Sequence, residues 1–251
     1  MRPTLPLLEQ ALANWRKWRI PLTCQPTLCR RLPGGQSNQT FLLDAGNTQL
    51  VLRLGLAGAT LLGVDRRREL QILLVVAEAG LAPKPLHVEP ARGLLVTEYV
   101  EGSKPEQSLF ANPDWQIMLS KTIKSLRQQS INLAPYPYRQ QMDNYWQQLS
   151  GAGHPGIEQQ YLNAVSALDL LEASSATQSL VHHDLNIDNL LIVNAQLMLL
   201  DWEYAGQGFT IMDDVALLHL GLNLSLNHPA KQWAAAQAIA GFLDNGWHLL
   251  R

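Results

Sequence analysis

Residues 180–204 read LVHHDLNIDNLLIVNAQLMLLDWEY, the most informative stretch of the chain. It opens with an H-x-D-x-x-x-x-N pattern that contains Asp184 and Asn189. Two apolar runs follow, at 190–193 and 197–200, and each is long enough for a short buried strand. The residues between the runs suit a tight turn, so we expect a hairpin that folds the chain back toward Asp184 and Asn189.

Asp201 is the first residue after the second apolar run, and the hairpin would place it near the other two side chains. Two carboxylates and an amide in one place suit the transfer of a phosphoryl group to a hydroxyl. One carboxylate accepts the hydroxyl proton, while the amide oxygen and the second carboxylate hold Mg²⁺ against phosphate oxygens. The stretch therefore predicts a catalytic site made from Asp184, Asn189 and Asp201.

The composition is that of a globular and rather uncharged protein. The chain has 251 residues, of which 47% are hydrophobic and 16% charged, and a formal net charge of −2. This charge gives no reason to expect nucleic acid or an anionic membrane as a partner, and no apolar run approaches the roughly 18 residues of a membrane span. Cys24 and Cys29 are too few for a disulfide scaffold or a four-ligand zinc site. The N-terminus makes a poor signal peptide, so a reduced, cytoplasmic location is expected.

The first half of the chain is expected to form strands around one central helix. An amphipathic helix is predicted at 5–19, where apolar residues recur at helical spacing. Asp65 and Gly80 then bound a second helical pattern. The strands expected here are 28–32, 40–44, 49–54, 86–88 and 94–98, and 102–105 is expected to be a linker.

The second half has mainly helical patterns, at 113–129, 138–149, 157–171, 213–226 and 230–243. This layout predicts an α+β protein with two lobes. A small sheet-rich lobe would span residues 1–101, and a larger, mainly helical lobe with the catalytic loop would span 102–251. Ligands often bind where two such units meet.

Two further features are candidates for phosphate binding, and each also has a purely structural interpretation. The glycines of PGGQSN, at 33–38, would let backbone N–H groups approach phosphate oxygens, although such a segment is often only a turn. Arg53 is a charge within an apolar strand, and Glu69 could be its partner unless both side chains are solvated. No P-loop sequence is present, and no G-x-G-x-x-G pattern opens a helix after an expected strand.

The motifs together resemble a known family. VHHDLNIDNLLIVN followed by LMLLDWEYAG is similar to the catalytic core of the aminoglycoside phosphotransferase and choline kinase superfamily. Upstream, PGGQSNQTFLLD resembles the nucleotide loop of choline kinases, QLVLRL their third strand, RRRELQILLVVAEAGLAPKPL the following helix, and LLVTEYVEG the hinge. The resemblance implies a bilobal protein-kinase-like fold, with a small antiparallel-sheet lobe and a larger, mainly helical lobe.

The resemblance also implies roles for individual residues. Asp184 would orient and deprotonate the acceptor hydroxyl, while Asn189 and Asp201 would hold Mg²⁺. Arg53 would contact the phosphates of ATP, and Glu69 would fix the conformation of Arg53. The other residues expected at the nucleotide are Gly34, Gly35, Ser37, Asn38, Glu98, Tyr99 and Val100.

Two residues are expected to shape the catalytic segment without touching the substrate. His182 would brace the loop by hydrogen bonds, because adjacent histidines cannot easily place both rings on one metal ion. The resemblance implies that Asp214 braces the same segment from the sequence MDDVALL. His183 stands where relatives often have a smaller or different residue.

The acceptor is expected to be a small alcohol. DWEYAG and YPYRQQMDNYWQQL together resemble bacterial thiamine kinases more than aminoglycoside kinases, and the C-terminal half lacks the dense acidic cluster that a polyamine calls for. Its aromatic residues could face a quaternary or thiazolium cation, or could simply pack in the core. The residues expected at the acceptor are Trp202, Glu203 and Tyr204.

Thiamine is the acceptor that these features favour, with choline or ethanolamine next. One alternative is a kinase for another alcohol, such as an amino sugar, an aminoglycoside or homoserine. Another is a catalytically silent nucleotide-binding module, although the joint presence of Asp184, Asn189 and Asp201 argues against it. The expected partners are the acceptor and Mg·ATP, with no nucleic acid and no membrane, in a monomer or homodimer.

Overall fold

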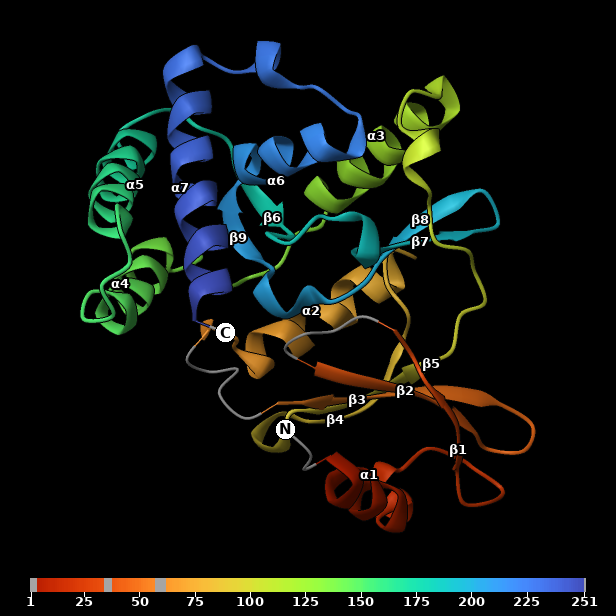
Figure 1. Ribbon diagram of the computed structural model, residues 1–251. Coiled ribbons are helices and arrows are strands. Elements are labelled where there is room, and N and C mark those ends of the chain that lie inside the picture. Colours follow the sequence, from red (N-terminus) through yellow and green to blue (C-terminus); the bar gives the residue numbers. More distant parts are fainter. Residues whose placement is uncertain (1–3, 34–37, 57–61, 251) are drawn as a thin grey trace.

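The computed structural model describes residues 4–33, 38–56 and 62–250. It has two parts, an N-lobe built on one sheet and a larger, mainly helical C-lobe (Figure 1). The α+β, bilobal fold predicted from the sequence is therefore confirmed. We propose to divide the lobes near residue 101, in the segment that leaves the sheet.

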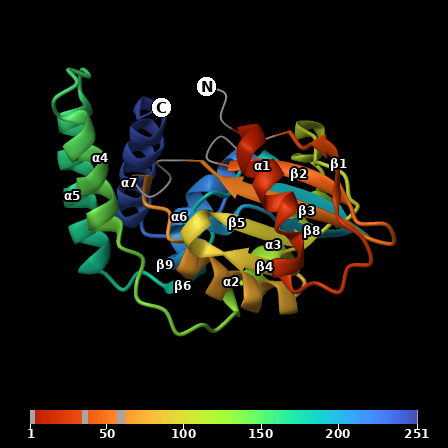
Figure 2. The ribbon, with the colours of Figure 1, turned by 90° about the horizontal axis from the view of Figure 1, so that it is seen from below.

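The N-lobe sheet is antiparallel, with the strand order β1-β2-β3-β5-β4. Helix α1 lies on one face of this sheet, and α2 lies on the other face, between the sheet and the C-lobe (Figures 1 and 2). The elements are α1 (Thr4–Ala13), β1 (Thr27–Arg31), β2 (Asn38–Asp44), β3 (Gln49–Gly55), α2 (Arg66–Glu78), β4 (Pro85–Glu89) and β5 (Leu94–Glu98).

The alternation of side chains in β3 explains how this lobe contributes to a polar site. Leu50, Leu52 and Leu54 are buried in a cluster that includes Leu8 of α1. Because successive side chains of a strand point to opposite faces, Arg53 projects away from α1 and toward α2.

The described part of the C-lobe contains five α-helices and two small antiparallel sheets. Helices α5 and α7 pack side by side, with α4 next to them (Figures 1 and 2). The helices are α3 (Pro113–Arg127), α4 (Tyr138–Leu149), α5 (Ile157–Glu172), α6 (Thr210–Leu217) and α7 (Ala230–Leu249). The sheets pair β6 (Gln178–Val181) with β9 (Gly206–Phe209), and β7 (Leu190–Val193) with β8 (Gln196–Leu199).

Short 3-10 turns connect these elements. Two of them, η5 (Ile187–Asn189) and η6 (Trp202–Tyr204), directly precede or follow the β7–β8 hairpin. The others are η1 (Trp15–Trp18), η3 (Pro90–Arg92), η4 (Gln107–Leu109), η7 (Leu218–Leu220) and η8 (Ser225–Asn227).

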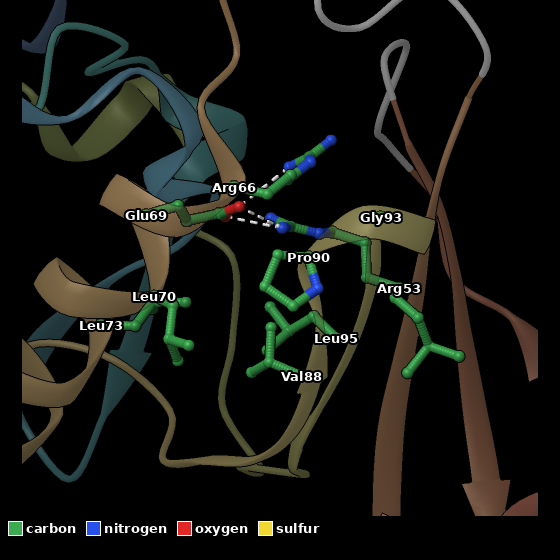
Figure 3. Close-up of a pocket in the computed structure, with 10 residues that line it drawn as sticks. Arg53, Arg66, Glu69, Leu70, Leu73, Val88, Pro90, Gly93 and Leu95 are labelled. Atoms are coloured by element: carbon green, nitrogen blue, oxygen red, sulfur yellow. Dashed lines mark hydrogen bonds and ion pairs between the residues drawn. The ribbon is translucent and has the colours of Figure 1, made fainter.

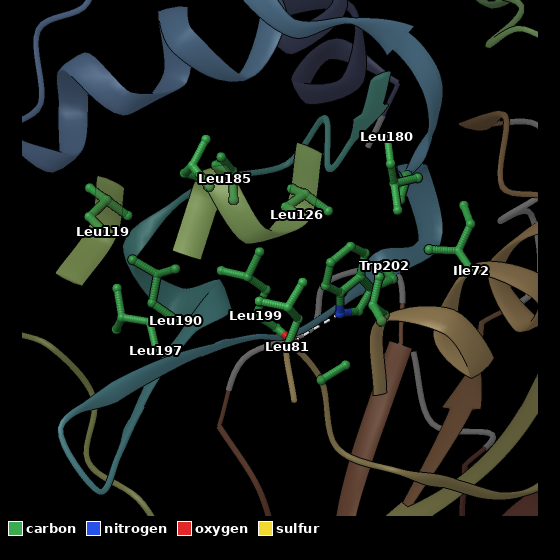
Figure 4. Packing of buried hydrophobic residues seen from close by; sticks show 14 of the residues in the cluster. Ile72, Leu81, Leu119, Leu126, Leu180, Leu185, Leu190, Leu197, Leu199 and Trp202 are labelled. Carbon is green, nitrogen blue, oxygen red and sulfur yellow. Dashed lines mark hydrogen bonds between the residues drawn. The ribbon is translucent and has the colours of Figure 1, made fainter. Parts of the chain in front are cut away.

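One apolar cluster joins the two lobes beneath the hairpin. Ile72 from α2 packs with Leu119 and Leu126 from α3 and with Leu190 and Leu199 from the hairpin (Figure 4). These side chains are at most 2% exposed. The β7–β8 hairpin is thus fixed by packing against buried side chains that include Ile72 of helix α2 in the N-lobe.

Most predicted elements are present, with four differences. The expected helix at 5–19 ends at Ala13 and continues as the separate turn η1, and the helix expected at 213–226 is shorter and begins earlier, as α6. Strands β6 and β9 were not predicted, because they are four residues long and β9 contains two glycines. The 102–105 linker is not free: Gly102 packs against β7, and Ser103 forms a β-bridge with Ile192.

Among the described residues, no helix combines the length and the apolar character needed to cross a membrane.

Candidate active site

The catalytic loop starts where β6 ends, and a buried carboxylate holds its backbone. The N–H groups of His182 and His183 donate to the two oxygens of Asp213, each at 2.9 Å. Burial raises the pKa of Asp213 to about 6, against the effect of these two hydrogen bonds. The expectation that Asp214 braces this segment is therefore wrong by one residue.

Asp214 contacts other residues of the C-lobe. Its carboxylate pairs with Arg127 of α3 and lies 2.8 Å from Nε2 of His228. Successive side chains on α6 are about 100° apart around the helix axis, so neighbouring aspartates reach different parts of the lobe.

The two histidine rings are structural and uncharged. His182 is buried, its Nδ1 accepts from the Asp184 N–H, and its Nε2 lies 3.1 Å from the Leu200 carbonyl. Burial lowers its pKa to about 4. The predicted bracing role of His182 is confirmed, because one ring links the catalytic loop to the end of the β7–β8 hairpin.

His183 has the backbone conformation and contacts of a fixed residue. Its φ is 64°, its Nδ1 lies 3.1 Å from the Tyr204 carbonyl, and its Nε2 lies 2.6 Å from the Tyr138 hydroxyl. The ring also stacks on Tyr136, with centroids 4.1 Å apart. Burial, followed by the nearby positive charge of Arg68, lowers the pKa of His183 to about 3.

Two amides hold the Asp184 carboxylate. Nδ2 of Asn186 donates to Oδ1 at 2.9 Å, and Nδ2 of Asn189 donates to Oδ2 at 2.8 Å. Asn186 in turn accepts from the N–H groups of residues 188 and 189, which fixes the η5 turn. Burial raises the pKa of Asp184 to about 6, although both amides favour the charged form.

The hairpin brings Asp201 back to the catalytic loop as predicted. Asn194 and Ala195 have positive φ values of 48° and 59°, which makes the two-residue turn between β7 and β8. After β8, the Leu200 N–H donates to the Asn189 carbonyl at 2.8 Å. Asp201 follows with a φ of 59°, and left-handed backbone in a residue other than glycine is often found at functional sites.

A buried cation connects Asp201 to the N-lobe. Nη2 of Arg53 donates to Glu69 at 2.7 Å, and Nη1 donates to Oδ1 of Asp201 at 3.1 Å. Burial alone would lower the pKa of Arg53, but the charges of Glu69, Asp201 and Glu203 raise it above its ordinary value. The Arg53–Glu69 pair is therefore present, and the alternative of two solvated charges is wrong.

A second arginine, which the sequence analysis did not single out, contacts the same carboxylate. Nη1 of Arg66 lies 2.9 Å from Oε2 of Glu69, so the Glu69 carboxylate lies between two guanidinium groups (Figure 3). Burial would raise the pKa of Glu69, but the two arginines lower it overall. Nη1 of Arg66 also lies 2.9 Å from Glu203, and Asn38 donates to Glu203 at 2.8 Å.

The residues expected at the acceptor lie in three different environments. Trp202 is 1% exposed, donates its indole N–H to the Leu199 carbonyl and belongs to the core cluster, so it does not line an acceptor site. Glu203 is 2% exposed and bound to Asn38 and Arg66, so its carboxylate holds the two lobes together. Trp202 and Glu203 are both buried residues of η6, so neither side chain is exposed for contact with an acceptor.

Tyr204 is half-buried and remains a candidate for acceptor contact. Its hydroxyl accepts a hydrogen bond from the indole N–H of Trp247, on α7, at 3.1 Å. Burial and the charge of Glu203 raise its pKa, so the phenol is neutral. Asp244 lies on the same helix as Trp247, and its charge is one of those that raise the pKa of Asp184.

The nucleotide residues predicted from the Gly-Gly loop are only partly described. Gly34, Gly35 and Ser37 lie outside the described residues. Asn38 begins β2, and its amide also lies 3.5 Å from Oδ1 of Asp201. Asn38 thus connects the first residue of β2 to Asp201 of the catalytic site.

The expected hinge residues follow the edge of the sheet. The Glu98 carboxylate accepts from the Lys84 N–H at 2.9 Å, and the Tyr99 N–H donates to the Gln49 carbonyl at 3.3 Å. Glu98, Tyr99 and Val100 are all half-buried. Their contact with an adenine ring stays a prediction.

The oxygen donors near Asp201 fit a hard divalent cation. Nδ2 of Asn189 is engaged with Asp184, which leaves its amide oxygen for a metal, and Asp201 supplies a carboxylate. Oxygen ligands of this kind are what Mg²⁺ prefers. Within the described parts of the chain, no group of three or more histidines, cysteines or acidic residues is arranged to hold a metal ion.

Several solved structures share this fold. A choline/ethanolamine kinase family protein from Mesorhizobium loti superposes with a TM-score of 0.73 at 23% identity, covering 99% of this chain and 86% of that one. The choline kinase LicA from Streptococcus pneumoniae gives 0.73 at 17% identity, covering 97% and 89%. The aminoglycoside phosphotransferase APH(4)-Ia gives 0.69 at 14% identity, covering 98% and 91%.

Sequence comparisons extend this result. Acyl-CoA dehydrogenase family member 11 from Gallus gallus is 27% identical over 225 residues, which are 74% of this chain and 29% of that protein. The chain thus spans less than a third of this curated relative. The model of the phosphotransferase enzyme family matches residues 28–251. The protein therefore belongs to the phosphotransferase enzyme family, as the resemblance of its catalytic motifs predicted.

Proposed function

We propose that the chain is a small-molecule kinase, which transfers the γ-phosphoryl group of Mg·ATP to the hydroxyl of a small cationic alcohol. The observation that carries this proposal is the Asp184 carboxylate, held by Asn186 and Asn189 in a loop that pairs with the chain one residue before Asp201. Phosphoryl transfer needs positioning and charge neutralisation more than covalent groups. A fixed carboxylate beside oxygen donors and a buried arginine supplies both.

Asp184 is the residue that we propose as the proton acceptor. With a pKa of about 6 its carboxylate is largely ionised at neutral pH, yet close enough to neutral pH to exchange a proton with a hydroxyl. The amides of Asn186 and Asn189 leave its oxygens little freedom to rotate. The acceptor hydroxyl would therefore meet an oriented base.

Asn189 and Asp201 would hold Mg²⁺, and Arg53 would contact the phosphates of ATP. The metal, when bound, supplies positive charge that offsets the charge on the phosphate oxygens during transfer. Glu69 and Arg66 fix Arg53 from the N-lobe side. Asn38, Glu98, Tyr99 and Val100, with Gly34, Gly35 and Ser37, are the other residues that we propose around the nucleotide.

Charge and aromatic groups near Asp184 support a cationic acceptor. Tyr204 and Trp247 are joined by a hydrogen bond, and Asp244 lies one helical turn before Trp247. Aromatic faces and a carboxylate are the groups that bind quaternary and related cations. Thiamine is the first acceptor that we propose, and choline and ethanolamine follow, the latter two also named in the descriptions of solved relatives.

A screen for ADP release tests the proposal. Thiamine, choline, ethanolamine, amino sugars, aminoglycosides and homoserine are compared at equal concentration, with Asp184→Asn as the inactive control. Turnover on a cationic alcohol that falls about 10²- to 10⁴-fold in Asp184→Asn is the expected result. Turnover on homoserine alone, which is a zwitterion without net charge at neutral pH, would contradict the acceptor class. Tight binding of Mg·ATP without any turnover would favour a silent binding module.

A matched pair of substitutions tests the acceptor contact. Asp244→Asn should raise KM for the cationic acceptor, on the order of tenfold if the carboxylate contacts the cation. Asp169→Asn removes another exposed acid, from α5, where it pairs with Arg139, and should leave KM unchanged. Equal KM values in both variants would remove Asp244 from the acceptor site.

A further inference from the structure

Arg66 connects three segments of the chain that are far apart in sequence. From the first turn of α2, Nη1 contacts Glu69 one turn further on and Glu203 of η6, each at 2.9 Å. Nη2 donates to Oδ1 of Asn38, at the start of β2, at 2.7 Å. One guanidinium group thus bonds to the helix, the sheet and the segment that carries Asp201.

Two of the three partners of Arg66 also bond to each other. Nδ2 of Asn38 donates to Oε2 of Glu203, the oxygen that Arg66 contacts. Asn38, Glu69 and Glu203 are 1%, 3% and 2% exposed, so the partners of Arg66 are shielded from water. Charges in such surroundings are costly unless they are paired, and the loss of one partner is felt by the others.

The packing around Arg66 leaves room for its guanidinium group. A Cβ atom added at Gly55 would lie 3.2 Å from Nη2 of Arg66 and 3.4 Å from the Gly93 carbonyl. The backbone of β3 therefore approaches the arginine closely, and a larger residue at this position would crowd the guanidinium group.

The charge balance of the site gives Arg66 a distinct task. Arg53 contacts both Glu69 and Asp201, yet in the proposed reaction Arg53 has to bind a phosphate and Asp201 a metal. If Arg53 were the sole cation, binding of a nucleotide would leave Glu69 and Glu203 poorly neutralised. Arg66 contacts both of these carboxylates.

We propose that Arg66 is a positioning residue that holds α2, β2 and η6, and with them the two lobes, in fixed relative positions; we call this arrangement the latch. Arg66 would also neutralise Glu69 and Glu203 when Arg53 binds phosphate. The proposal rests on the proposed function, because its ligand is Mg²⁺ with an adenine nucleotide. Arg66 itself would not touch the acceptor. Its effect would appear in nucleotide affinity, through Arg53 and Asp201.

The test is a double-substitution cycle on nucleotide affinity in the absence of an acceptor. Binding of Mg·AMP-PNP is measured by calorimetry for the wild type, Arg66→Met, Glu203→Gln and the combination of both. Arg67→Met is the matched control, because Arg67 is the next residue of the same helix turn and is exposed. Circular dichroism and melting curves confirm that each variant is folded at the temperature used.

The expected result is a fall in affinity on the order of 10- to 100-fold for Arg66→Met and less than about twofold for Arg67→Met. The combined variant should bind no more weakly than Arg66→Met alone, because the two residues share one interaction. Arg66→Lys should recover part of the affinity, since an ammonium can contact one carboxylate but lacks the planar fork that reaches three partners. If Arg66→Met does not fold, the comparison of Arg66→Lys, Glu203→Gln and their combination carries the same test.

Two results would overturn the latch: nucleotide affinity of Arg66→Met within twofold of the wild type, or effects of Arg66→Met and Glu203→Gln that multiply independently. These outcomes are separate from the fate of the proposed function. If Arg66→Met and Glu203→Gln are coupled in nucleotide binding but no alcohol is turned over, the latch stands and the kinase function is rejected. If an alcohol is turned over but the two substitutions are not coupled, the kinase function stands and the latch is rejected.

Discussion

Nη1 of Arg53 lies 3.1 Å from Oδ1 of Asp201, which pairs the cation of the N-lobe sheet with the carboxylate that we assign to the metal. The same guanidinium group is bound to Glu69 through Nη2. Arg53 therefore connects the two carboxylates that must keep their places when Mg·ATP enters. Its position between the lobes makes it sensitive to substitution in both activity and stability.

Replacement of Arg53 by methionine should lower kcat/KM by about 10²- to 10³-fold, because a fixed positive charge near the phosphates is lost. The free energy of unfolding should fall by only about 1–3 kcal/mol, since Arg66 still contacts Glu69. Steady-state kinetics and urea unfolding measure the two quantities. Arg53→Lys should be intermediate in rate, and a rate equal to the wild type in Arg53→Met would remove this residue from phosphate binding.

The raised pKa of Asp184 predicts an acid limit to activity. The carboxylate must be ionised to accept a proton, so kcat/KM should be constant above pH 7 and fall about tenfold for each pH unit below about 6. Asn186→Asp removes a donor to Asp184 and adds a negative charge, while it keeps an acceptor for the η5 turn. Both changes favour the protonated form of Asp184, so the fall in kcat/KM at acid pH should begin at a pH higher by roughly one unit or more.

A pH–rate profile of the wild type and Asn186→Asp checks this prediction. Arg67→Met serves as a control for a change of net charge at an exposed position. If kcat/KM falls at the same acid pH in all three proteins, a group other than Asp184 limits the rate.

Substitutions of Asp213 and Asp214, which are neighbours on α6, should affect different properties, the first mainly kcat and the second mainly stability. Asp213→Asn keeps one acceptor oxygen and leaves the other backbone N–H of the His182–His183 pair facing an amide group, so the catalytic loop should lose its position. We expect kcat to fall more than tenfold in Asp213→Asn. Asp214→Asn removes the charge that pairs with Arg127 and lies beside His228, and should lower the melting temperature with kcat within about threefold of the wild type.

These variants differ by one position and one substitution type, so each is the control of the other. Kinetics well below both melting temperatures separate the effect on the loop from the loss of stability. A larger loss of kcat in Asp214→Asn would restore the original expectation for Asp214.

The parts of the fold that follow from local patterns were predictable from sequence. The β7–β8 hairpin follows from two apolar runs around a short polar turn, and its consequence, the return of Asp201 to the catalytic loop, needs only that geometry. Helix α4 has the predicted bounds, because its apolar residues recur at helical spacing between clear breaks. The Arg53–Glu69 pair was one of two open alternatives, and the burial of both side chains decided it.

The features that depend on the side of a helix or turn could not be predicted. In DRRRE the three arginines look alike, yet Arg66 binds buried carboxylates, Arg67 is exposed and Arg68 lies over the Tyr136 ring. A shift of one residue turns a helical side chain by about 100°, so the sequence pattern alone does not choose among neighbours. The same ambiguity explains the error between Asp213 and Asp214.

Trp202 gives the clearest separation between a core role and an acceptor role. Because its ring is 1% exposed and packs against His182, with centroids 4.7 Å apart, Trp202→Leu should lower the free energy of unfolding by about 2–4 kcal/mol. KM for the acceptor should stay within about twofold of the wild type at a temperature where the variant is folded, whereas Trp247→Leu, from the half-buried position beside Tyr204, should raise it. Urea unfolding and acceptor titrations of both variants provide the measurement. If Trp202→Leu raised KM as much as Trp247→Leu without loss of stability, the tryptophan after the metal-site aspartate would be an acceptor residue after all.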